Sequence, residues 1–128
     1  MEELLTRITQ KTGLEHATAR KAVGIILAYL KKEGPPNEVN QLFAAMPGAE
    51  DVIKDTNSEG GGGGGLMGMM GSMGGGVMAL GGQLMAAGVS MGQMQPLGQE
   101  LFAFGREKAR EDVMGGIVGS IPGLSQFV

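Results

Sequence analysis

The sequence has no cysteine and no tryptophan, and its single tyrosine is Tyr29. Without cysteine the chain forms no disulfide, carries no thiolate nucleophile and has no cysteine-based zinc site. Aromatic residues make up only 4% of the chain, whereas hydrophobic residues in total make up 42%. The core must therefore be built from Leu, Ile, Val, Met and Ala, a composition that favours helices over a β-sandwich.

Positive charge is also scarce. Ten Lys and Arg residues stand against thirteen Asp and Glu residues, which gives a net charge of −3. Because binding to nucleic acids depends on a basic face, and the basic residues here are few and dispersed, we expect no nucleic-acid partner. The N-terminal residues Met1, Glu2 and Glu3 lack the basic start and the apolar run of a secretory signal, so we expect a cytoplasmic protein.

Residues that could form a catalytic centre are few. The single histidine, His16, is expected on the surface. The glycine run 60–65 is followed by no Lys-Ser/Thr pair, which excludes a phosphate-binding loop. Four acidic residues lack the order of a calcium loop and are expected to solvate a helix end: Glu50, Asp51, Asp55 and Glu59. We therefore expect a non-enzymatic protein without catalytic residues or cofactor.

Apolar residues recur at three- and four-residue spacing, which predicts an all-α fold. In the N-terminal part the pattern predicts helices from Glu2 to Gly13, from Glu15 to Lys32 and from Pro35 to Pro47, followed by a short turn with Val52 and Ile53. In the C-terminal part it predicts helices over 77–87, from Gln95-Pro96 to Arg110 and over 113–121. Residues 55–65 are expected to form a linker, since six consecutive glycines hold no fixed conformation alone.

The two ends of the chain align with each other without a gap when Gly13-Leu14 is placed on Gly88-Val89. In this repeat alignment the breaker pair Pro47-Gly48 falls on Pro122-Gly123. Few residues are identical, but apolar positions coincide through three successive segments. We therefore expect a small helical bundle built from two similar halves that share one core and are joined by a glycine-rich linker. The predicted boundaries are 1–55 for the N-terminal half, 56–76 for the linker and 77–128 for the C-terminal half. Pro96, opposite Lys21, indicates a later start for the second long helix.

An ordered series of apolar and breaker residues runs through the N-terminal half: Leu4-Leu5, Lys11-Thr12-Gly13-Leu14, Ala19, Ile26-Leu27, Leu30, Leu42-Phe43 and Met46-Pro47-Gly48-Ala49. Together with the glycine-rich middle and the string Gly88-Val89-Ser90, this series resembles the VcgC/VcgE family of bacterial proteins, which is distantly YidB-like. The resemblance implies an all-α fold. The family has no established activity, so the resemblance implies no functional residues.

No charged residue occurs from Gly60 to Gln99, and eight of the eleven methionines lie there. Methionine is an adaptable apolar side chain that is common at binding surfaces. We therefore expect an interaction surface that includes six of them: Met67, Met69, Met70, Met73, Met78 and Met85. The predicted function is binding to another protein or self-association through this Met/Gly-rich surface.

Two alternatives remain open for this segment. The uncharged segment 66–89 is long enough to span a bilayer, and small residues recur there at four-residue spacing. It would suit a membrane-associated or oligomer-forming protein, although the many glycines weaken hydrophobicity and helix formation. The thioethers of Met67, Met69, Met70 and Met73 could instead bind Cu(I), a soft metal ion.

Overall fold

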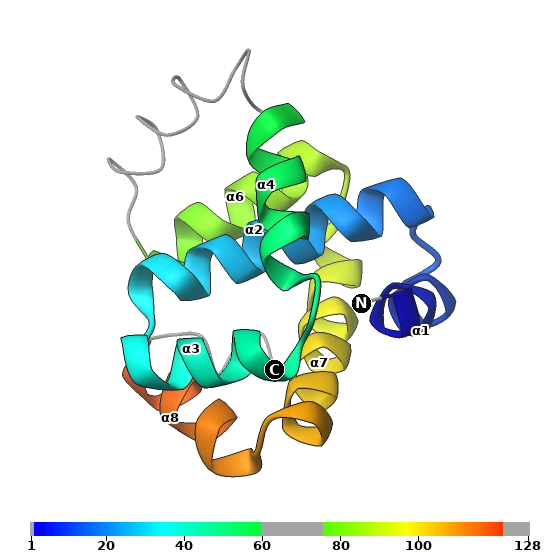
Figure 1. The fold of residues 1–128 in the computed structure, drawn as a ribbon. Helices are drawn as coiled ribbons and strands as arrows, with labels where there is room; N and C mark the ends of the chain where they lie inside the picture. Colours follow the sequence, from blue (N-terminus) through cyan, green and yellow to red (C-terminus); the bar gives the residue numbers. More distant parts are fainter. Residues whose placement is uncertain (1, 60–75, 122–128) are drawn as a thin grey trace.

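The computed structural model describes residues 2–59 and 76–121, and the side chains of 2–54 and 80–121. These residues form helices and no strand (Figure 1), which confirms the predicted all-α fold. The helices are α1 (Glu2–Thr12), α2 (His16–Glu33), α3 (Pro36–Ala45), α4 (Ala49–Glu59), α6 (Gly76–Ala87), α7 (Met91–Lys108) and α8 (Glu111–Ser120).

Local chemistry sets the ends of α1. Glu2 and Glu3 occupy the first turn, where the helix dipole favours negative charge, and Lys11 occupies the last. Gly13 then takes a positive φ of 77°, a conformation that costs glycine little. The Thr12 hydroxyl donates a hydrogen bond to the Ile8 carbonyl and accepts one from the Leu14 N–H, so the chain turns directly into α2.

The helix α4 is longer than the sequence predicts. We expected only a short turn before a linker that begins at Asp55. The helix instead continues past Asp55 to Glu59. Gly48, with a φ of 92°, redirects the chain into this helix, and acidic residues occupy its first turn. Its apolar face packs on α2 (Figure 1), where Val52 and Ile53 are buried. Burial of this face favours continuing the helix through polar residues that alone predict a linker.

The start of α7 also differs from the prediction. The helix begins at Met91 and contains Pro96, whereas the sequence predicted a start near Gln95-Pro96. The side chain of Gln93 secures the first turn: its Oε1 accepts hydrogen bonds from the Ser90 N–H and hydroxyl, both at 3.1 Å. Its Nε2 donates to the Thr12 carbonyl at 3.0 Å, which ties this turn to the end of α1. These contacts stabilise the first turn of α7. The helix then continues through Pro96, although proline lacks the backbone N–H that would donate to the preceding turn.

Pro96→Ala is therefore expected to stabilise the protein. Alanine restores the backbone donor that proline lacks and suits a helix better, so we expect a gain on the order of 1 kcal/mol in the free energy of unfolding. Urea denaturation followed by circular dichroism measures it. A decrease in stability would show instead that the proline ring makes packing contacts that outweigh the lost hydrogen bond.

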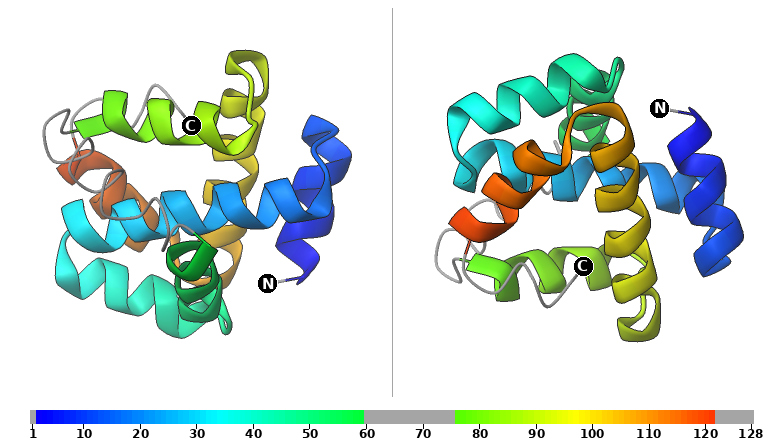
Figure 2. Two further views of the ribbon diagram at one scale, coloured as in Figure 1. Left: turned by 90° about the horizontal axis from the view of Figure 1, so that it is seen from above. Right: turned by 90° about the horizontal axis from the view of Figure 1, so that it is seen from below.

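The helices pack into one apolar core. Helix α1 lies against α7, α6 against α2, and α3 against α8, as both views of Figure 2 show. The buried hydrophobic residues of the described helices form a single cluster, and no polar or charged side chain among the described ones is buried. The core therefore joins residues from both ends of the chain, and its stabilisation comes from apolar burial.

The helix bounds recur along the chain in agreement with the repeat alignment. Helix α7 begins and ends at the positions that the alignment equates with the ends of α2, and α8 does the same for α3. Helix α6 ends at the position equivalent to the end of α1 and begins one position earlier than the alignment requires. The glycines that follow α1 and α6, Gly13 and Gly88, both have positive φ values. Helix α7 therefore begins where the repeat alignment places it. Our expectation that Pro96 would delay its start was wrong.

Candidate interaction surface

The structure places two of the six predicted surface methionines on α6. Met67, Met69, Met70 and Met73 lie outside the described residues. Met78 lies in α6, where the structure describes its backbone only. Met85 lies in the last turn of α6 and is 55% exposed. Met85 is therefore the one predicted residue whose exposure the structure describes.

A further methionine, Met91, is exposed on the other side of the turn between α6 and α7. It opens α7, just after the turn that follows α6, and it is 75% exposed. Among the described side chains, Met85 and Met91 are the large hydrophobic ones that are exposed. The sequence prediction did not include Met91 in the interaction surface, although it lies in the same uncharged stretch. The repeat alignment could have indicated that Met91 is exposed. It pairs position 91 with His16, which was expected on the surface.

The two methionines belong to an uncharged surface at the junction of α6 and α7, which we call the α6–α7 corner. Its exposed residues are Gly82, Met85, Ala86, Gly88, Ser90, Met91, Gly92 and Gln95. Met94, one turn further along α7, is buried in the core. The corner therefore offers two flexible thioethers among small residues, a surface that can adapt to an apolar partner but holds no group for acid–base chemistry.

The equivalent side of the molecule, where α1 packs on α7, is charged. The Arg7 guanidinium contacts the carboxylates of Glu107 at 2.8 Å and Glu100 at 3.4 Å. It also lies over the ring of Phe104, 5.7 Å from the ring centroid. The hydrogen bond with Glu107 raises the pKa of Arg7 above its ordinary value. Lys108 reaches the same ring and the carboxylate of Glu3. This seam is therefore closed by groups of both charges.

The seam between α6 and α2 lacks charged groups at three of the equivalent positions. The repeat alignment pairs Arg7 with Gly82, Lys11 with Ala86 and Glu100 with Ile25. Ile25 is partly buried against the core, and a Cβ placed on Gly82 would meet no atom within 4 Å. Helix α6 thus supplies no charged side chain where α1 supplies Arg7 and Lys11, whereas α2 keeps charged residues, Lys32 and Glu33, at the positions equivalent to Glu107 and Lys108.

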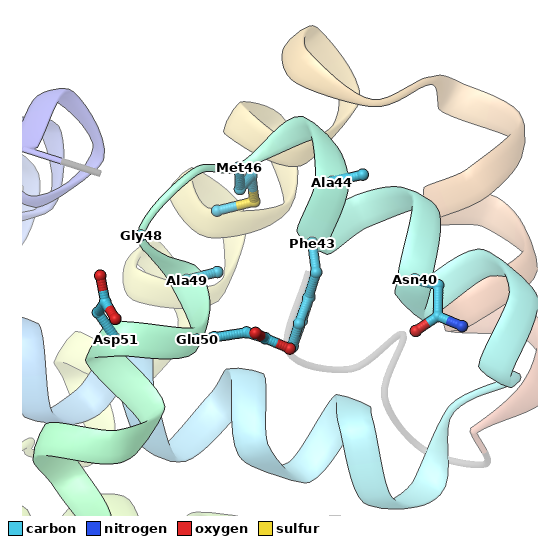
Figure 3. A pocket seen from close by; sticks show the side chains of 8 residues that line it. All are labelled: Asn40, Phe43, Ala44, Met46, Gly48, Ala49, Glu50 and Asp51. Atoms are coloured by element: carbon cyan, nitrogen blue, oxygen red, sulfur yellow. The ribbon is translucent and has the colours of Figure 1, made fainter.

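A second candidate site is a shallow pocket at the start of α4, whose lining residues Figure 3 shows. Phe43, Glu50 and Asp51 lie on its wall. The Lys31 ammonium lies 5.9 Å from the Phe43 ring centroid and 3.5 Å from a Glu50 carboxylate oxygen. Because Phe43 and Glu50 are already engaged by Lys31, the pocket is explained by the packing of α3, α4 and α2.

The remaining sequence candidates have structural partners or lie apart. His16 Nε2 lies 3.0 Å from the Glu2 carboxylate on an exposed part of the surface, in agreement with the expected surface position. Glu50, Asp51, Asp55 and Glu59 all lie in α4. Within residues 2–59 and 76–121, no three histidine or acidic side chains come together as a metal site.

Searches of protein-family models, curated proteins and solved structures found no match to this chain. Among the helices that the structure describes, none combines the length and hydropathy needed to cross a bilayer. Any functional conclusion must therefore come from the surface of this chain itself.

Proposed function

We propose that the protein is non-enzymatic and acts by binding another protein or by self-association through the α6–α7 corner. One observation carries this proposal: the exposed large hydrophobic side chains among those described, Met85 and Met91, flank the turn between α6 and α7 in a stretch without charge. Exposed apolar side chains that cluster on one surface mark interaction sites, whereas isolated ones are ordinary. Methionine also suits such sites because its side chain adapts to the partner.

We also propose that the chain consists of two similar halves around one core. The agreement of the helix bounds with the repeat alignment supports this, and so does the reciprocal packing of α1 on α7 and α6 on α2. Membership of the VcgC/VcgE family is a further proposal, which rests on the residue series Leu4 to Ala49 and is compatible with the all-α fold. That membership would leave the proposed function unchanged, since the family has no established activity.

Site-specific photo-crosslinking in the native host tests the proposed function. A photoreactive amino acid is placed at position 85 or 91, and matched variants carry it at positions 10 and 16, their counterparts in the repeat alignment. We expect positions 85 and 91 to yield a discrete protein adduct after illumination. Positions 10 and 16 should yield none, because Gln10 and His16 belong to an ordinary polar surface.

The result can contradict the proposal in two ways. Equal crosslinking from all four positions would show that exposure alone produces the adducts. Absence of any protein adduct, together with crosslinking to lipid at positions 85 and 91, would favour the membrane alternative. The Cu(I) alternative has a separate test, since anaerobic Cu(I) addition would shift methionine methyl NMR signals if those sulfurs bind it.

A further inference from the structure

We propose that charged residues in the seam between α1 and α7 make the pairing of the two halves selective. The N-terminal half, helices α1 to α4, binds the C-terminal half, helices α6 to α8, and rejects a second N-terminal half. This inference rests on the proposal that the chain consists of two similar halves, and it names the residues that select the partner.

The contacts between the halves come in exchanged pairs. Helix α1 packs on α7 and α6 packs on α2, although α1 is equivalent to α6 and α2 to α7 in the repeat alignment. Glu38 of α3 lies beside Gly116 of α8, and the exchanged residues, Gln41 and Val113, line one pocket. This exchange indicates a rough twofold relation. Two N-terminal halves could therefore pair in the same way, with α1 of each copy on α2 of the other.

Within the chain, α1 meets opposite charges on α7. The Arg7 guanidinium lies 2.8 Å from a Glu107 carboxylate oxygen and 3.4 Å from one of Glu100. The Glu3 carboxylate lies 3.8 Å from the Lys108 ammonium. Helix α1 thus presents one cation and one anion at positions where α7 presents the matching opposite charges.

A second N-terminal half would present the wrong charges to α1. The repeat alignment equates Glu107 with Lys32 and Lys108 with Glu33, and both α2 residues are exposed. Arg7 of one copy would meet Lys32 of the other, and Glu3 would meet Glu33. Twofold symmetry would repeat each repulsive contact. A single exposed ion pair contributes little to stability, but like charges opposed at several positions penalise a wrong partner.

Side-chain size in the contact of α3 with α8 favours the same partner. A Cβ at Gly116 would lie 3.2 Å from the Glu38 Cγ, so a side chain there would have to displace Glu38. The equivalent residue in the N-terminal half is Gln41. A second N-terminal half would therefore place a long side chain where Glu38 now packs against a glycine.

Two C-terminal halves would meet no such repulsion, because α6 carries no charged residue that could oppose those of α7. The selectivity therefore resides in the N-terminal half. Reversing the charges of α1 should make this half match α2 of a second copy and repel α7 of its own chain.

Refolding of the full chain from urea at high concentration, followed by sedimentation equilibrium, tests the inference. Glu3→Lys combined with Arg7→Glu reverses both charges of α1. This double variant should associate into dimers with a constant about tenfold or more above that of the wild type. Adding Glu107→Arg and Lys108→Glu restores opposite charges across the seam, so the quadruple variant should return to the wild-type constant.

The three proteins form a matched set. Each pair of changes reverses one acidic and one basic residue, so all three keep the net charge of −3. None of the changes lies in the α6–α7 corner, so self-association through that corner would affect all three equally. Equal association in all three would overturn the inference and leave the proposed function standing. A double and a quadruple variant that associate alike would also overturn it.

Gly116→Gln tests the contribution of side-chain size, because it gives α8 the residue that the N-terminal half has at this position. It should lower the urea midpoint of the full chain relative to Gly119→Gln. The control makes the same change on the same helix, at a position where a Cβ meets no atom within 4 Å. Equal midpoints would overturn the part of the inference that depends on side-chain size.

Discussion

Phe102→Ala is expected to lower the free energy of unfolding by about 3–5 kcal/mol, the largest effect that we predict for a single substitution. The Phe102 side chain is 1% exposed and lies in the core cluster shared by helices from both ends of the chain. Its truncation removes apolar burial and leaves a cavity that the surrounding helices fill only in part. Urea denaturation followed by far-ultraviolet circular dichroism measures the change.

The shape of the transition carries as much information as its midpoint. Because the core is continuous, Phe102→Ala should shift a single cooperative transition and leave its slope against urea unchanged. Leu27→Ala, at the equivalent position of α2, should shift the same transition by about 2–5 kcal/mol. Two separate transitions, one sensitive to each substitution, would contradict a shared core.

Gly34→Ala should destabilise the protein by about 1–3 kcal/mol. A Cβ at Gly34 would lie 2.6 Å from the Leu30 carbonyl oxygen and 2.8 Å from Val39 Cγ2. The carbonyl belongs to the backbone of α2, and it already accepts a hydrogen bond from the Gly34 N–H. Relief of the clash must therefore move the chain between α2 and α3.

The comparison with Gly115→Ala isolates this steric cause. Both changes add one methyl group, but a Cβ at Gly115 meets nothing within 4 Å, so that variant should gain stability. The two variants are compared by thermal denaturation under identical conditions. Equal melting temperatures would show that the turn after α2 yields without cost, in conflict with the close approach at Gly34.

Much of the fold could be predicted from the sequence because its helices are bounded by strong local signals. The apolar spacing of Ala22, Ile26 and Leu30 and the breakers Gly34 and Pro35 place α2 and the start of α3 within a few residues. Two boundaries could not be predicted this way. The extent of α4 depends on its burial against α2, and the start of α7 depends on Gln93, which reaches the Thr12 carbonyl far earlier in the chain.

The candidate surface was predicted only in part. Absence of charge directed attention to residues 60–99, and Met85 proved exposed there. Composition could not separate exposed from buried methionines: Met91 is exposed but Met94, one turn later, is buried. That difference is set by which side of α7 faces the core.

Expression of residues 1–59 and 66–128 as two separate chains in one cell tests the shared core most directly. If α1 packs on α7 and α6 on α2 as the structure shows, neither fragment can bury its apolar faces alone. The two fragments should therefore purify together through a tag on either one, elute as a 1:1 complex and give the helical circular dichroism spectrum of the intact protein. Fragments that elute separately, each folded and helical, would contradict the account.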